Sequence, residues 1–264
     1  MNKVKKIVSL ILLAQIFGLI NPVIADEDVL FIGHAYGTHG GGVIPYPPLE
    51  KFLNKNTLPN IRIWGGDLTE NARRFPEFKQ YIDTLGGVNL LVRGNYDGRN
   101  LWSKTPYWTD YVTPNNIWIH NLDMSEDMKF EGLPSGPSII ASHYAYFNEL
   151  FKPYNIPNSM YGIEDRDLSQ DDLKMQKVRV LIAGDCGAFR SLTAGFAQTE
   201  IGQNKFVCTG MGGGSGFDNV VIVTKKGEIN PIFFDSYGQV LQKTCKLLKA
   251  NSPYSNTIKI CSAI

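Results

Sequence analysis

The chain has 264 residues, and its 26 lysines and arginines nearly balance its 25 aspartates and glutamates, for a net charge of +1 at pH 7. Such a balance gives no electrostatic case for binding nucleic acid or an anionic membrane. The length is sufficient for one sizeable α/β core. No linker-like stretch divides residues 26–264, so we predict a single domain there.

The N-terminus has the pattern of a secretory signal peptide. Three lysines within the first six residues precede an apolar run over residues 7–20, and the short segment after it ends at Ala25. This run is shorter than the roughly 20 apolar residues that a membrane-spanning helix needs, and Gln15 interrupts it. We therefore predict a signal peptide over residues 1–25, cleaved after Ala25. The mature protein would be periplasmic or secreted, with no membrane span.

Export places the four cysteines in an oxidising compartment, where disulfides persist. Cys245 and Cys261 close a short C-terminal loop and are the preferred pair, although four cysteines allow three pairings. Cys186 and Cys208 can pair if their strands are neighbours. No Cys-x-x-Cys spacing is present, which argues against a thiolate metal site.

Strands and helices alternate in the first part of the mature chain. Apolar runs at Val29–Ile32, Asn60–Trp64 and Val88–Val92 predict buried strands. Helices are expected between them at Leu49–Lys55 and over Thr69–Leu85. This order of strand, helix and strand predicts parallel pairing, with the helices over the faces of the sheet.

A long insertion separates two of the later strands. It covers residues 144–177, and a loop of that length inside a compact domain is usually a lid or a binding surface. The last strands of the pattern are expected to be antiparallel, with a Lys-Lys-Gly turn before the final one. The strands expected in this part are Ile117–His120, Ser138–Ala141, Val178–Ala183, Phe206–Cys208, Val220–Thr224 and Ile229–Phe234.

Five loops that follow apolar strands carry His, Asp or Asn at their tips. Loops at strand ends gather polar groups over a rigid scaffold, so five such loops predict one converging metal site. In chain order these segments are Gly33-His34-Ala35-Tyr36-Gly37, Gly65-Gly66-Asp67, Gly94-Asn95-Tyr96-Asp97, Ser142-His143-Tyr144 and Gly184-Asp185-Cys186-Gly187.

The order of these segments resembles that of the calcineurin-like metallophosphoesterases. The family pattern is Asp-x-His, Gly-Asp, Gly-Asn-His-Asp/Glu, a lone His and then Gly-His-x-His, and the resemblance extends from about Val29 to about Phe234. It implies an α/β fold, a sandwich of two mixed β-sheets flanked by helices. It also implies hydrolysis of a phosphoester by two divalent metals that share a bridging Asp and activate a water.

The resemblance assigns four metal ligands by position. Asp67 matches the bridging carboxylate, Asn95 the amide ligand and His143 the lone histidine of the second metal. Asp185 stands where the family has the first His of the last motif, and it can still supply an oxygen. This oxygen-rich shell suits Mn²⁺, Fe²⁺, Mg²⁺ or Zn²⁺.

The other metal position departs from the family pattern. His34 stands in place of its Asp, Tyr36 in place of its His, and Gly187 in place of the last His. A glycine donates no ligand, and a phenol must first ionise from a pKa of about 10. His34 and Asp185 thus exchange ligand types between two loops that should face one another. We expect a single-metal or asymmetric two-metal site, with about one ion per chain.

The resemblance also indicates roles for other side chains. Tyr96 stands where the family has its catalytic histidine, and a phenol can donate a proton but has a pKa far from neutrality. Turnover is therefore expected to be slow. The predicted catalytic residues are Tyr96, Asp97 and His34, and the predicted substrate-binding residues are Arg99, Tyr36 and His39.

Two functions are compatible with these residues. The leading prediction is an exported metal-dependent phosphoester hydrolase acting on a phosphorylated small molecule, glycan or lipid. The alternative is a non-catalytic protein that keeps this scaffold to bind a phosphorylated glycan, lipid or partner protein, and Tyr36, Tyr96 and Gly187 favour it. The fourth histidine, His120, ends a strand and is expected to be structural.

Overall fold

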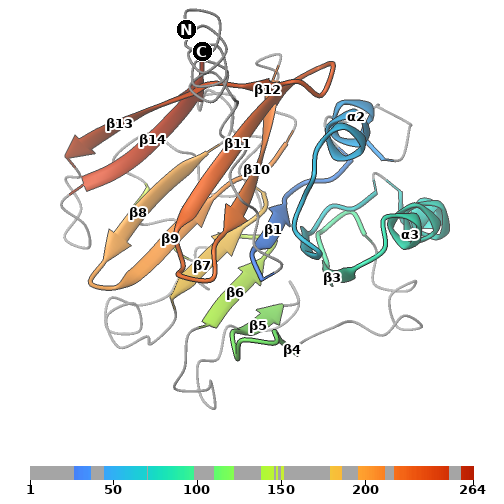
Figure 1. The fold of residues 1–264 in the computed structure, drawn as a ribbon, viewed down its shortest axis with the longest axis horizontal. Helices are drawn as coiled ribbons and strands as arrows, with labels where there is room; N and C mark the ends of the chain where they lie inside the picture. Colours follow the sequence, from blue (N-terminus) through green and yellow to red (C-terminus); the bar gives the residue numbers. More distant parts are fainter. Residues whose placement is uncertain are drawn as a thin grey trace, which may run out of the picture.

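The computed structural model of this chain describes residues 27–36, 45–69, 71–97, 110–121, 138–145, 147, 150–151, 179–185, 196–211, 217–249 and 257–264. Two mixed β-sheets, one of six strands and one of eight, form the body of the protein (Figure 1). This confirms the predicted fold class. None of the helices in the described ranges is long and apolar enough to cross a membrane. The predicted signal peptide lies outside these ranges.

The six-stranded sheet has the order β12-β11-β10-β1-β2-β3. Its strands β1, β2 and β3 are parallel, as the alternation of strands and helices predicts, and β10 joins β1 in antiparallel register. The elements of this layer are β1 (Val29–Ile32), α2 (Pro47–Lys55), β2 (Ile61–Gly65), α3 (Phe75–Thr84), β3 (Val88–Val92), β10 (Phe217–Val223), β11 (Ile229–Asp235) and β12 (Val240–Leu241).

The eight-stranded sheet has the order β13-β14-β8-β9-β7-β6-β5-β4. The strands β9, β7, β6 and β5 are parallel to one another, and the pairings on either side of this group are antiparallel. The strands are β4 (Asp110–Val112), β5 (Trp118–Asn121), β6 (Ser138–Ser142), β7 (Val180–Ala183), β8 (Ala197–Ile201), β9 (Asn204–Cys208), β13 (Lys243–Lys249) and β14 (Thr257–Ala263).

Strand β1 is buried on both faces, which explains its continuous apolar run. Phe31 points between the sheets and belongs to a core cluster with Ile139 of the other sheet. Leu30 points to the opposite face, where Phe52 of α2 and Phe78 of α3 cover the six-stranded sheet. A strand packed on both sides has no solvated face, so it loses the alternation of polar and apolar residues.

Helix α3 begins later than the sequence pattern predicted. We expected a helix from Thr69, but the helix starts at Phe75 and follows a 3₁₀ turn over Ala72–Arg74. Pro76 explains this start. A proline fits in the first turn of a helix, where its missing N–H has no partner to lose, but it would break a helix further along.

The chain ends in a hairpin of β13 and β14 at the edge of the eight-stranded sheet, where we expected only a loop. Strand β13 carries three lysines in a sequence without clean alternation, so periodicity did not reveal it. The strand register places Cys245 opposite Cys261, and these two cysteines are disulfide-bonded, which confirms the predicted pair. Cys208 is also disulfide-bonded, and Cys186 lies outside the described residues.

Removing the hairpin disulfide should lower stability without altering the rest of the fold. The two cysteines are 16 residues apart, and a cross-link of that span is worth about 3 kcal/mol in the loop-entropy model. The Cys245→Ala/Cys261→Ala double variant should therefore melt about 6–12 °C below the parent in a calorimetric scan. An unchanged melting temperature would show that this cross-link constrains nothing in the unfolded chain.

Little of the predicted insertion at residues 144–177 falls in the described part of the chain. Near its start, the ring of Phe147 packs on Phe206 of β9, with ring centroids 5.5 Å apart. Val207, next to Phe206, faces the core between the sheets, so Phe147 covers the outer face of the eight-stranded sheet. A lid or binding role for the insertion stays a prediction.

Candidate metal centre

Backbone contacts between glycines bring the loops of the two sheets together. A Cβ atom on Gly184, after β7, would lie 2.1 Å from the carbonyl oxygen of Gly65 at the end of β2. A Cβ atom on Gly33, after β1, would lie 2.7 Å from the Cα of Gly184. Only residues without a side chain allow this approach, so three strand ends from two sheets meet at one place.

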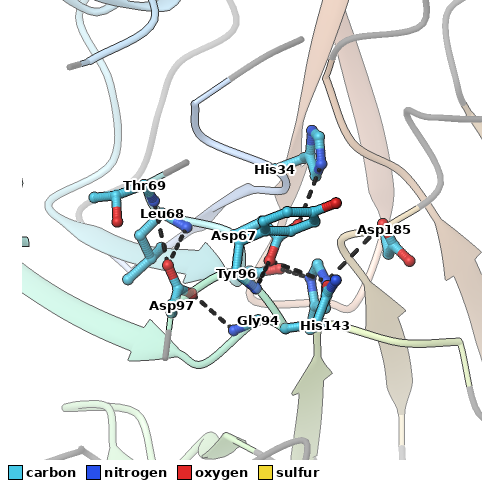
Figure 2. Close-up of polar contacts among 11 residues, drawn as sticks. His34, Asp67, Leu68, Thr69, Gly94, Tyr96, Asp97, His143 and Asp185 are labelled. Atoms are coloured by element: carbon cyan, nitrogen blue, oxygen red, sulfur yellow. Dashed lines mark hydrogen bonds and ion pairs between the residues drawn. The ribbon is translucent and has the colours of Figure 1, made fainter. Parts of the chain in front are cut away.

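Asp67 lies at the centre of the polar residues gathered there (Figure 2). Its side chain is only 1% exposed, and each of its carboxylate oxygens faces a different histidine. Oδ2 lies 3.3 Å from Nε2 of His34, and Oδ1 lies 3.4 Å from Nε2 of His143. Oδ1 also accepts a hydrogen bond from the main-chain N–H of Tyr96 at 3.1 Å.

The backbone at this centre adopts a rare conformation at two non-glycine residues. Asp67 has φ of 48° and His34 has φ of 55°, both in the left-handed region. Such residues are costly and persist where the surrounding structure holds them, often at functional sites. The neighbouring Gly66, with φ of 82°, leaves room for the ring of His143, whose Nδ1 lies 2.5 Å from the place of a Cβ.

His143 connects the other predicted ligands. Its Nε2 lies 2.8 Å from Oδ1 of Asn95 and 3.9 Å from Oδ1 of Asp185, and its Nδ1 lies 3.3 Å from the carbonyl oxygen of Gly65. The four residues predicted from the sequence as metal ligands are therefore brought together around one imidazole nitrogen. Their role as ligands stays a prediction.

The residues have the chemistry and the spacing that a divalent cation needs. One ligand atom each from His34, Asp67 and Asp185 lie within 4.8 Å of one another. Ligands about 2.1 Å from a cation are separated by about 3 Å when adjacent and about 4 Å when opposite. The separations around Asp67 and His143 fall mostly within this range. The described residues thus include a group that could hold a metal ion, and His34 belongs to it.

Burial and mutual attraction set the charges of the cluster. Burial raises the pKa of Asp67, but the nearby imidazoles of His143 and His34 outweigh it, and the pKa lies below its usual value. Burial lowers the pKa of His34, but the hydrogen bond to Asp67 and the charges of Asp67 and Asp185 outweigh it, so the pKa is raised. Asp185 has a raised pKa, chiefly because it is buried. Because a metal ligand must be deprotonated, cation binding at His34 would compete with the protonation of its imidazole.

Two tyrosine rings lie next to the cluster. The ring of Tyr36 is buried and lies with its centroid 4.6 Å from that of His34. The rings of Tyr36 and Tyr96 pack edge to face, with centroids 5.9 Å apart. The predicted substrate-binding residue Tyr36 and the predicted catalytic residue Tyr96 are thus both next to the cluster.

Asp97 was predicted to be catalytic, but its carboxylate lies on the far side of the Asp67 loop from His34 and Asp185 (Figure 2). It is buried and accepts hydrogen bonds from the main chain rather than facing the cluster. The remaining predicted site residues, His39 and Arg99, lie outside the described residues, as does Gly187.

Sequence reasoning did not identify the glycines that permit the site. Gly66 and Gly184 occur in the five loop segments, but a single sequence does not indicate which glycine lies close to another backbone or ring. His120, which we expected to be structural, lies apart from the cluster in the strand pair β4–β5. Its Nδ1 pairs with Oδ1 of Asp110 at 2.7 Å.

The fold and the site together define an α/β sandwich with a buried centre of histidines and carboxylates at its strand ends. No family profile and no curated protein sequence matches the chain. Among solved structures, it is similar to Vps29 of Chaetomium thermophilum, with 15% sequence identity and a TM-score of 0.39. That match covers 90% of this chain and 97% of Vps29.

Proposed function

We propose that this protein is an exported, metal-dependent phosphoester hydrolase. The observation that carries the proposal is the buried carboxylate of Asp67, which has an imidazole on each oxygen. Asp67, Asn95, His143 and Asp185 would hold the cation, and His34 would complete the set from the other oxygen of Asp67. The order of the five motifs, which resembles that of the calcineurin-like phosphoesterases, supports the same function.

A divalent ion held by these residues would offset the charge of a phosphate group and lower the pKa of a bound water. The protein supplies the charge that retains such an ion, because Asp67 stays ionised beside the two histidines. Tyr96 would hydrogen-bond the phosphate or donate a proton to the leaving oxygen. A phenol has an ordinary pKa of about 10, so this donation is slow near neutral pH and favours substrates with easy leaving groups.

We propose one Mn²⁺, Fe²⁺, Zn²⁺ or Mg²⁺ per chain and a phosphorylated small molecule, glycan or lipid as the substrate. The single ion follows from the other metal position, where Tyr36 and Gly187 stand in place of the family's histidine ligands. Export is supported by the signal-like pattern of residues 1–25 and by the disulfides, which persist in oxidising compartments.

A second function, binding of a phosphorylated ligand without turnover, is favoured by one observation. The buried ring of Tyr36 packs beside the ring of His34. A phenol is a poor ligand for a divalent cation at neutral pH. A protein with this arrangement could keep its cation and recognise a phosphate without hydrolysing it.

Metal content and turnover together test the proposal. The purified mature protein should contain about one equivalent of a divalent metal by elemental analysis. With Mn²⁺ added, it should hydrolyse an aryl phosphate monoester or diester, and a chelator should abolish that activity. Metal binding without turnover of either ester would support the binding function instead. Absence of any bound divalent ion under these conditions would contradict the hydrolase.

A further inference from the structure

Asp97 connects the two loops that carry Asp67 and Asn95. Its Oδ1 accepts hydrogen bonds from the N–H groups of Leu68 at 2.8 Å and Thr69 at 3.2 Å. Its Oδ2 accepts one from the N–H of Gly94 at 2.8 Å. These donors are the two residues after Asp67 and the residue before Asn95. Both oxygens of one buried side chain are thus used on the main chain beside two proposed ligands (Figure 2).

A second hydrogen bond between the two loops runs from the Asn95 loop to the side chain of Asp67. Oδ1 of Asp67 accepts the N–H of Tyr96, the residue before Asp97. Gly94 packs directly on the Asp67 loop, since a Cβ on Gly94 would lie 2.1 Å from the main-chain nitrogen of Asp67. Each loop therefore binds the other through an aspartate and a main-chain N–H. This reciprocal contact joins the loop of Asp67 to the loop of Asn95.

We propose that Asp97 is a positioning residue of the metal centre, and not a proton donor or a ligand. Its carboxylate sets the separation of the Asp67 and Asn95 loops, so that the amide oxygen of Asn95 meets Nε2 of His143. The inference rests on the proposed function in taking this cluster to be a metal centre. Partners beyond the ligands of a metal typically change affinity by about 10–100-fold when they are removed.

Two substitutions distinguish the two arms of this contact, which are the bonds of Oδ1 to Leu68 and Thr69 and the bond of Oδ2 to Gly94. Asp97→Asn keeps one oxygen, which can still accept the N–H groups of Leu68 and Thr69. Its amide nitrogen would then face the N–H of Gly94, donor against donor, so only the arm next to Asn95 is released. Asp97→Ala releases both arms and leaves buried N–H groups without acceptors, which costs stability.

Asp235 offers a matched control for Asp97→Asn. Its Oδ1 accepts the N–H groups of Tyr237 at 2.8 Å and Gln239 at 2.9 Å in the turn between β11 and β12. One oxygen of Asp235 therefore accepts two main-chain N–H groups within a single turn, away from the proposed ligands. Asp235→Asn should leave the metal centre unchanged.

Amide exchange and the ring signals of His143 test the proposal without any metal. In the ¹⁵N-labelled protein with chelator, Asp97→Asn should lower the exchange protection of Gly94 at least tenfold, keep that of Leu68 and Thr69, and shift the ring resonances of His143. In calorimetric titrations, Zn²⁺ or Mn²⁺ affinity should fall about 10–100-fold in Asp97→Asn and stay at the parent value in Asp235→Asn.

The outcomes separate this inference from the proposed function. Unchanged His143 resonances in Asp97→Asn, with Gly94 protection lost, would overturn the positioning role and leave Asp97 as a local structural contact. Unchanged metal affinity alongside shifted resonances would also overturn it. If the parent protein binds neither ion, the proposed function fails, and the shift of the His143 resonances alone decides whether Asp97 positions the cluster.

Discussion

The Asp67→Asn variant is expected to fold and to lose its divalent cation. Asparagine has the same shape as aspartate and tolerates the left-handed backbone conformation that residue 67 adopts, with φ of 48°. The substitution removes the carboxylate charge whose two oxygens face His34 and His143. Affinity for Mn²⁺ or Zn²⁺ should fall by more than about 100-fold, beyond the usual effect of an outer partner.

Calorimetric titration and elemental analysis measure this loss directly, and turnover of the aryl phosphate esters should fall with it. Asp28→Asn is the matched control, because Asp28 is also buried and accepts a main-chain N–H, that of Lys225, just before β1 begins. Its metal affinity should equal that of the parent. Full occupancy in Asp67→Asn would refute the proposed role of the Asp67 carboxylate.

The Gly184→Ala variant should disrupt both stability and the metal centre, although it adds only one methyl group. The new Cβ would lie 2.1 Å from the Gly65 oxygen and 3.1 Å from the Cα of Gly33, so backbone must move at the junction of the two sheets. Overpacking of this kind costs about 1–3 kcal/mol, or a fall in melting temperature of roughly 2–12 °C for a chain of this size.

The displacement should also carry Asp185 and Gly65 away from His143, so metal affinity should fall along with stability. Gly202→Ala is the comparison, since a Cβ there meets nothing within 4 Å but has a positive φ of 60°. It should show a modest loss of stability from backbone strain, with metal affinity unchanged. If Gly184→Ala binds metal as tightly as the parent, the close approach of the glycines does not hold the site together.

Much of the chain could be predicted because its signals are local. Val29–Ile32 and Val88–Val92 are strands with the predicted bounds, since apolar runs that end at glycine are marked by the sequence itself. The order of motifs also predicted Asp67, Asn95, His143 and Asp185 as ligands, and the fold brings these side chains together. Helix α3 was predicted to start too early, at Thr69. The proline at position 76 fixes the first turn of the helix and decides its start over the helix-start signal of the polar residues before it.

The position of Asp97 could not be predicted in the same way. The motif Gly94-Asn95-Tyr96-Asp97 does not reveal whether the last carboxylate faces a substrate or the main chain of a loop nearly 30 residues away. Its donors on Leu68 and Thr69 are brought near only when β2 and β3 pair in parallel. The C-terminal hairpin was missed for a related reason, since the pairing of β13 with β14 stabilises a strand that has no clear alternation of its own.

By itself the amino-acid sequence determined which residue types occur at the strand ends, because an apolar run and the glycine that ends it are local signals. It also determined the preferred disulfide, because Cys245 and Cys261 are close along the chain. Only the tertiary structure decided that one carboxylate lies between two histidines and that Asp97 faces away from them. Those arrangements depend on backbones from two sheets approaching at Gly33, Gly65 and Gly184, and such contacts arise only when the whole chain is packed.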